Sequence, residues 1–169
     1  MLIAAAGARQ GTMVWNIMDI RQCPHLADIV TDRIWRAWWK DKGHGIEVIE
    51  GPVRHNLASG DAFPFCLVAG RGGTFLGTVS LIANDVAERP ELTPWVAALW
   101  VEPAARGQGL ATTLLSAAQT QAAAIGLGRL YLLAARRMEA FYRERGWQVL
   151  ESGTPAPQMT ILVRDAVIR

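Results

Sequence analysis

A glycine-rich turn between an apolar segment and a helix-like segment is the part of this sequence best suited to chemistry. Trp95–Val101 is apolar, Arg106-Gly-Gln-Gly-Leu-Ala111 follows as the turn, and Thr112 begins a stretch with the composition of a helix. A turn of this kind places several backbone N–H groups at the positive end of a helix dipole, where a phosphate binds well. The sequence therefore predicts a site for a phosphorylated ligand at this turn.

Two common phosphate-binding turns do not fit. The P-loop requires a lysine directly after its second glycine, and no lysine lies near this turn. The dinucleotide fingerprint requires a third glycine or alanine, and this sequence has Thr112 at that position. The fingerprint also directly follows the first strand of its βαβ unit. Three expected strands instead precede the strand that leads into this turn, and no acidic residue stands at the distance that would bind a ribose.

The remaining pattern is Arg/Gln-x-x-Gly-x-Gly/Ala, which Arg106–Ala111 satisfies. Further along the chain, Ala140-Phe-Tyr-Arg-Glu-Arg-Gly-Trp147 has an aromatic-tyrosine pair on a helix that ends in Gly-Trp. Together these segments resemble the two motifs of the GNAT superfamily of N-acetyltransferases, in the manner of its bacterial small-molecule members. The resemblance covers about residues 14–165, and its diagnostic part is residues 95–147.

The resemblance implies that the ligand is acetyl-CoA. Backbone N–H groups from Gly107 to Ala111 would hold its pyrophosphate, Arg106 would add a positive charge, and backbone groups of residues 99–101 would pair with the pantetheine arm. One N–H of that strand would also stabilise the developing oxyanion. The expected acetyl-CoA contacts are Leu99, Trp100, Val101, Arg106, Gly107, Gln108, Gly109, Leu110, Ala111 and Thr112.

Tyr142 is the expected general acid. Once an amine has attacked the thioester, the departing thiolate takes up a proton. A phenol with a pKa of about 10 can protonate a thiolate whose acid has a pKa of about 8.5 with only a modest penalty.

The general base is harder to identify. Many family members use a carboxylate on the fourth strand, but Trp95–Val101 has none, and Trp95 stands where a glutamate is frequent. Asp85, at the end of the neighbouring strand, is the expected base. A second departure is Ala135, which stands where the family often has an asparagine that contacts CoA.

The acceptor is expected to be a primary amine on a small molecule or peptide. Loops and helix ends usually line such clefts. Acidic and aromatic side chains there would suit a cationic amine. The expected acceptor contacts are Trp35, Trp38, Asn84 and Trp95.

The elements that must position these groups follow from hydrophobic periodicity. Strands are expected at 14–20, 65–69, 74–82, 95–101, 129–133, 147–150 and 159–163. Helices are expected at 25–40, from 110 to 126 or 128, and around 138–145, with a helical or irregular connection at 46–57. We expect an α/β (α+β) domain, and the strand at 129–133 is apolar enough to be buried on both faces. The resemblance implies a mixed, mainly antiparallel sheet of six to seven strands with about four helices and a splay between strands four and five.

Composition limits the remaining possibilities. The chain has 169 residues, of which 51% are hydrophobic, and these values favour one folded domain at 13–169 with a loose tail or start-site extension at 1–12. A net charge of +2 is too small to indicate a nucleic-acid surface. The two cysteines lack metal-ligand spacing, and no apolar run reaches the roughly 20 residues of a membrane span. We expect a cytoplasmic monomer or homodimer that uses acetyl-CoA and no metal.

Two alternatives to acetyl transfer stay open. The missing strand carboxylate would suit a non-catalytic acyl-CoA-binding module, and the donor could be an acyl-CoA longer than acetyl. Neither motif contains a cysteine that could carry the acyl group, so direct transfer in a ternary complex is the expected route.

Overall fold

A seven-stranded sheet with the order β1-β2-β3-β4-β5-β7-β6 forms the centre of the computed structural model, which describes residues 15–166. All neighbouring strands are antiparallel except β4 and β5, which are parallel. The strands are β1 Asn16–Asp19, β2 Phe65–Arg71, β3 Thr74–Ile82, β4 Trp95–Val101, β5 Arg129–Ala135, β6 Gln148–Ser152 and β7 Met159–Asp165.

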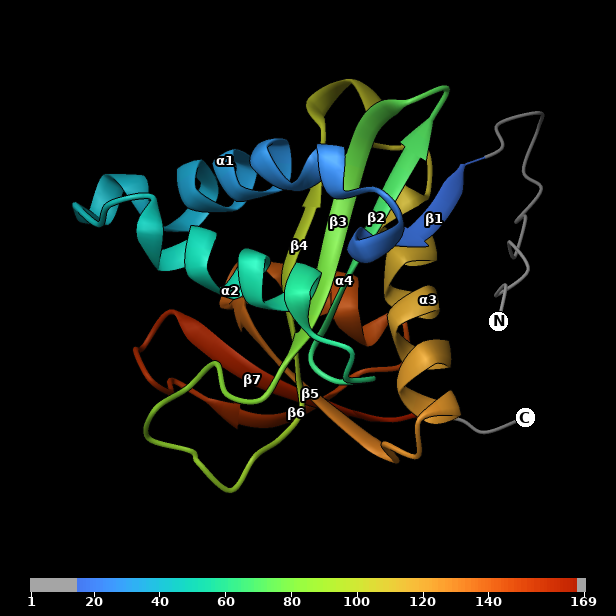
Figure 1. The fold of residues 1–169 in the computed structure, drawn as a ribbon. Helices are drawn as coiled ribbons and strands as arrows, with labels where there is room; N and C mark the ends of the chain where they lie inside the picture. Colours follow the sequence, from blue (N-terminus) through green and yellow to red (C-terminus); the bar gives the residue numbers. More distant parts are fainter. Residues whose placement is uncertain (1–14, 167–169) are drawn as a thin grey trace.

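Four α-helices cover the sheet, with α1 and α2 on one face and α3 and α4 on the other (Figure 1). The helices are α1 Ala27–Trp38, α2 Glu47–Ala58, α3 Leu110–Ala124 and α4 Glu139–Arg143. Short 3-10 turns connect several elements: η1 Ile20–Gln22, η2 Pro24–Leu26, η3 Lys40–Lys42, η4 Pro103–Ala105 and η5 Arg136–Met138.

The expected order of strands and helices is confirmed, and so is the mixed α/β sheet with its splay. The segment at 46–57 is a true helix although Gly51-Pro52 lies within it, because its own residues Val53 and Asn56 are buried on the inner face of the helix. Tertiary burial of one face can outweigh such local penalties. The expected start of β1 at residue 14 and the tail at 1–12 lie outside the described residues.

Strand β5 departs from its expected burial on both faces. Leu130, Leu132 and Ala134 are buried, whereas the alternate residues Tyr131 and Leu133 are only partly buried. The buried set packs in the cluster under α3, and the other set meets only a small cluster that includes Val86. Helix α3 therefore covers one face of β5, while the other keeps some contact with solvent.

Alternation along β2 shows how the two larger clusters share the sheet. Phe65, Leu67 and Ala69 pack in the α3 cluster, whereas Cys66 and Val68 pack in the α1/α2 cluster. Successive side chains of a strand point to opposite faces. Because helices lie on both faces, all five side chains are buried, and the core consists of two layers.

A bulge in β4 is the feature that shapes the site. Thr78 pairs with Trp100 and Ser80 with Ala97, so β4 contains one more residue than β3 in this interval. Ala98 has a φ of +52°, a left-handed conformation that is costly for a residue other than glycine. On its other side, β4 pairs with β5 only through Trp95↔Tyr131 and Val96↔Leu132 among the described residues. Beyond this point the two strands diverge.

Gly77 of β3 lies directly against this part of β4. A Cβ at Gly77 would be 2.7 Å from the Trp100 carbonyl oxygen and 3.1 Å from the Leu114 Cδ1 atom. We expect Gly77→Ala to lower the free energy of unfolding by about 1–3 kcal/mol through overpacking. Gly60→Ala is the matched control, because a Cβ there would meet no atom within 4 Å. Equal urea midpoints for the two variants would contradict the expected clash.

Candidate active site

The turn from Arg106 to Leu110 adopts a conformation that requires its glycines. Gly107 and Gly109 have φ values of +73° and +84°, a region that other residues enter at a cost. Gly109 is the N-cap of α3 and has no side chain that could accept a hydrogen bond. The first N–H groups of the helix therefore have no capping acceptor and can donate to a ligand. A Cβ at either glycine would meet no protein atom within 4 Å, so the turn opens on space that a ligand could fill.

A cavity of about 510 Å³ lies against this turn. It extends from the end of β4 across the turn to α4, and every expected acetyl-CoA contact except Gln108 lines it. Its walls are Leu99, Trp100, Val101, Ala105, Arg106, Gly107, Gly109, Leu110, Ala111, Thr112, Met138, Phe141, Tyr142 and Arg145.

Gln108 points away from the cavity. Its side-chain Nε2 donates to the Ala104 carbonyl at 3.0 Å, and its Oε1 is buried without a hydrogen-bond partner. The side chain therefore ties the turn to η4, and only the backbone of Gln108 can face a ligand.

Arg106 borders the cavity with its side chain folded back against β4. Its Nε donates to the Val101 carbonyl at 2.9 Å, and its guanidinium carbon lies 4.9 Å from the centre of the Trp100 ring. These contacts hold the charge at the end of β4, next to the splay.

Arg145 is a wall residue that sequence analysis did not assign to the site. Its Nε donates to the Thr112 hydroxyl at 2.8 Å and its Nη1 to the Phe141 carbonyl at 2.6 Å. It therefore connects α4 to the first turn of α3 and adds a second cation to the cavity wall. Its spacing of four residues from Phe141 places both on one face of the helical segment, but the contact with Thr112 is long-range.

Tyr142 is half-buried on α4 and lines the same cavity. Its ring packs edge-on against Phe141 and Trp147, with centroids 5.1 and 6.4 Å away. Burial raises the pKa of the Tyr142 phenol, and the charge of Arg145 partly opposes this effect. The hydroxyl is therefore protonated at neutral pH and can donate a proton into the cavity.

Asp85 follows β3 and does not line this cavity. Its side chain contacts solvent, but the surrounding protein still restricts hydration and raises the pKa of the carboxyl. The positive charge of Lys42 on η3 acts in the opposite direction. Its neighbour Val86 packs with Tyr131 and Leu133, so this connection lies over the face of β5 that is turned away from α3.

The residues expected to contact the acceptor lie in different parts of the molecule. Trp38 is 39% exposed, and its ring meets that of Trp100 edge-on at 6.3 Å, so it reaches β4 from the α1 side. Trp35 donates its Nε1 to the His44 carbonyl at 2.8 Å, and Asn84 is exposed in the β3–β4 connection.

Trp95 does not lie where an acceptor could reach it, which corrects its expected role. The side chain is 0% exposed, packs against Tyr131 and donates its Nε1 to the Leu92 carbonyl at 2.5 Å. The β3–β4 connection folds over β5 and β7 and covers it through Val86. Trp95 is a core residue that supports the β4–β5 junction.

Two further observations concern residues 15–166 alone. No three His, Cys, Asp or Glu side chains there form a group that could hold a metal ion. No helix in this part of the chain is both long and apolar enough to cross a membrane.

Solved structures share this fold. A Desulfovibrio desulfuricans protein assigned to the GNAT family has a TM-score of 0.71 and 15% identity, with 91% of this chain and 100% of that chain covered. An aminoglycoside 6'-N-acetyltransferase complexed with coenzyme A has a TM-score of 0.69 and 14% identity, covering 93% and 99%. An acyl-CoA N-acyltransferase from Pseudomonas aeruginosa has a TM-score of 0.63 and 21% identity, covering 89% and 97%. Identities this low show the shared fold alone.

The family itself is shown by sequence. No curated protein matches the chain, but the family model described as acetyltransferase (GNAT) matches residues 28–147, well over half of its length. This match spans the glycine turn and the Phe141-Tyr142 segment, the two features that meet at the cavity. The chain therefore belongs to the GNAT family of acetyltransferases.

Proposed function

We propose that this protein transfers an acetyl group from acetyl-CoA to a primary amine, by direct attack of the amine in a ternary complex. The observation that carries the proposal is the composition of the 510 Å³ cavity: the glycine turn, the end of β4 and Tyr142 all line it. An anion site, unpaired strand backbone and a proton donor in one cavity are the parts that acyl transfer from a CoA thioester requires.

The residues present fit acetyl-CoA. The free N–H groups at the start of α3 and the open space before Gly107 and Gly109 suit a pyrophosphate. Arg145 adds positive charge to that wall. Leu99, Trp100 and Val101 lie beyond the last β4–β5 pair. Apart from the Val101 carbonyl, which accepts from Arg106, their backbone groups on that edge can hydrogen-bond an extended amide arm.

The proton transfers require two groups. An amine with a pKa of about 10.4 is protonated at neutral pH and must lose a proton before it can attack. Asp85, whose pKa is raised by the surrounding protein, is the proposed acceptor of that proton, directly or through water. Tyr142, held protonated by its raised pKa, then donates its hydroxyl proton to the departing sulfur. The second proton that the attacking nitrogen must lose restores the phenol, directly or through water.

One observation favours a rival, a non-catalytic acyl-CoA-binding module. The residues that line the cavity include no aspartate or glutamate. The deciding experiment combines calorimetric CoA binding with thiol release from acetyl-CoA in the presence of a panel of amines. Tight CoA binding without thiol release for any amine would establish the rival. Parallel assays with longer acyl-CoA donors determine the acyl preference.

Asp85→Asn is expected to lower kcat/KM for the amine by about tenfold at neutral pH, a modest effect for a base because water can substitute. A raised pKa means that the carboxylate forms at a higher pH than for an ordinary aspartate. The difference between wild type and variant is therefore full above that pKa and disappears as the pH falls through it. A pH profile of kcat/KM measures this.

Glu88→Gln is the matched control for this substitution. It removes another acid of the same connection, and Glu88 is exposed. A wild-type profile in Asp85→Asn, or an equal loss in Glu88→Gln, would remove Asp85 from the role of base.

A further inference from the structure

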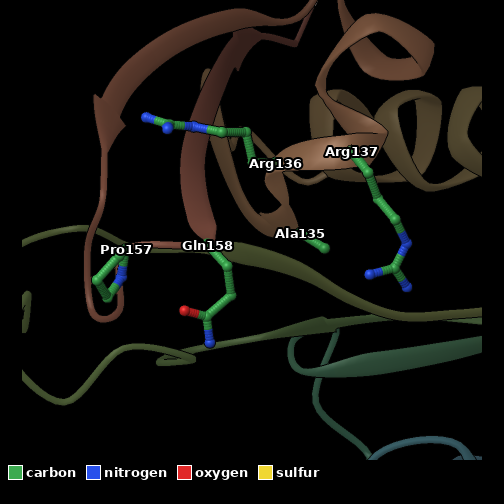
Figure 2. A pocket seen from close by; sticks show the side chains of 5 residues that line it. All are labelled: Ala135, Arg136, Arg137, Pro157 and Gln158. Atoms are coloured by element: carbon green, nitrogen blue, oxygen red, sulfur yellow. The ribbon is translucent and has the colours of Figure 1, made fainter.

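A second pocket, of about 410 Å³, lies at the carboxyl end of β5 and shares no wall residue with the first cavity. Figure 2 shows its lining side chains, which come from the end of β5, from η5 and from the β6–β7 connection: Ala135, Arg136, Arg137, Pro157 and Gln158.

The pocket opens beside the splay, on the sheet face turned away from the glycine turn. Ala135 lies three residues beyond Leu132, where the pairing of the parallel strands β4 and β5 ends. By strand alternation Ala135 shares its face with Leu133, whereas Leu132 packs on the opposite face together with Leu110 of α3. A ligand in this pocket could thus approach the splay from the face opposite the proposed pyrophosphate site.

The backbone around the pocket is fixed. Ala135 pairs with Met159 in the β5–β7 ladder, and the Arg136 N–H donates to the Gln158 carbonyl at 2.7 Å. The Met159 N–H also donates to the Ala156 carbonyl at 2.9 Å, which closes the turn that holds Pro157. The side chains of this pocket therefore project from a hydrogen-bonded backbone frame.

Two arginines that line this pocket have unpaired guanidinium groups. Arg136 and Arg137 are exposed and have no hydrogen-bond or ion-pair partner for their guanidinium groups, whereas every other arginine in residues 15–166 has a partner. A guanidinium presents five donors in a planar fork that fits a carboxylate in bidentate geometry. This corner of the sheet therefore offers donors that the protein itself leaves unused.

The two arginines point in different directions. In Figure 2 the side chains of Arg137 and Gln158 extend to the same side, with the small Ala135 between them, whereas that of Arg136 extends away from both. A guanidinium and a side-chain amide thus extend from the same side of this pocket, on either side of the Ala135 methyl group in this view.

We propose that Arg137 and Gln158 bind a carboxylate of the acceptor, so that the acceptor is an amine that also carries a carboxylate, as in an amino acid. This inference rests on the proposed function, which supplies the reaction at the splay. Val86, the neighbour of Asp85, packs over the same face of β5 that carries Ala135, so the proposed base and the proposed carboxylate site lie on one side of the sheet. The opposite charges of such an acceptor match the opposite charges of Asp85 and Arg137.

The test uses matched amines that carry either a carboxylate or a carboxamide, such as β-alanine with β-alaninamide and 6-aminohexanoate with its amide. For each protein, the measured quantity is kcat/KM for the acid divided by kcat/KM for the amide. We expect this ratio to be about tenfold lower in Arg137→Ala than in wild type, which is the range expected for the loss of one charge-assisted hydrogen-bonded pair. Intrinsic amine reactivity cancels in this comparison. Arg136→Ala is the matched control and should leave the ratio within about twofold, because a surface charge that makes no contact contributes little.

The outcomes separate this inference from the proposed function. Turnover of amines without a change in the ratio on Arg137→Ala, or with equal changes in both arginine variants, would overturn the inference and leave acetyl transfer standing. If no amine releases thiol, acetyl transfer fails. Calorimetry with the acids and the CoA-saturated protein then decides the anion site: binding lost only in Arg137→Ala supports it, and no binding to wild type overturns it.

The donor is the other possible source of an anion, through the 3'-phosphate of CoA. Measuring KM for acetyl-CoA and for acetyl-dephospho-CoA in wild type and Arg137→Ala tests this source. We expect the substitution to leave both values unchanged. A KM increase for acetyl-CoA that is absent for the dephospho donor would assign Arg137 to the donor and overturn the inference.

Discussion

Gly109→Glu is expected to raise the Kd for CoA by at least about 100-fold, because like charges held close together cost several kcal/mol. The Cβ position of Gly109 opens on free space next to the cavity, so the new carboxylate would stand where the pyrophosphate is proposed to bind. The φ of +84° adds strain of about 1–2 kcal/mol for any residue with a Cβ. Calorimetric titration with CoA measures the loss of affinity, and thermal unfolding measures the strain.

Gly126→Glu is the matched control for this substitution. It adds the same charge and a similar backbone strain at a position away from the glycine turn. Gly126 has a φ of +83°, a Cβ there would also meet open space, and it lies at the other end of α3. The control variant should lose a similar amount of stability and bind CoA with wild-type affinity. Unchanged affinity in Gly109→Glu would show that the turn does not bind the pyrophosphate.

Tyr142→Phe is expected to lower kcat by about 100-fold, at the lower end of the usual effect of a general acid, because ordered water can replace the hydroxyl. The phenyl ring keeps its edge-on contacts with Phe141 and Trp147, so the Kd for CoA should stay close to that of wild type. Because the pKa of Tyr142 is raised, wild type should keep its donor to a higher pH than an ordinary tyrosine would allow. The decline of kcat at alkaline pH should therefore be absent from the variant.

Tyr131→Phe is the matched control, since the chain has two tyrosines and Tyr131 packs against Trp95 outside the cavity. Its kcat should equal that of wild type. A wild-type kcat in Tyr142→Phe would instead assign protonation of the sulfur to water.

Local pattern predicted the elements that shape the donor cavity. The bounds expected for β3 and β4 match the structure, and the turn before α3 has the two left-handed glycines that its sequence requires. These features depend on residues that are close together in the sequence, namely alternating apolar residues, a proline and glycines. Long-range contacts are not needed to predict them.

Features that depend on distant contacts could not be predicted in this way. The sequence predicts that Trp95 is in a strand but not which face of the sheet its side chain is on. Trp95 is buried because the β3–β4 connection covers this part of β5 through Val86. The role of Arg145 depends on Thr112, which is 33 residues earlier in the chain. The direction of the Arg106 side chain likewise depends on the Trp100 ring. Motif spacing predicted where these residues lie along the chain and not which atoms they contact.

The splay between β4 and β5 also bears on how this fold can diverge in evolution. Beyond Val96 and Leu132 the proposed contacts of β4 with the donor are made by main-chain groups, which every residue except proline supplies in full. Side chains there can change without removing those groups, provided that the bulge and the glycine conformations persist. Selection on the shape of the backbone therefore permits wide sequence drift, in agreement with a TM-score of 0.71 at only 15% identity to the Desulfovibrio desulfuricans protein.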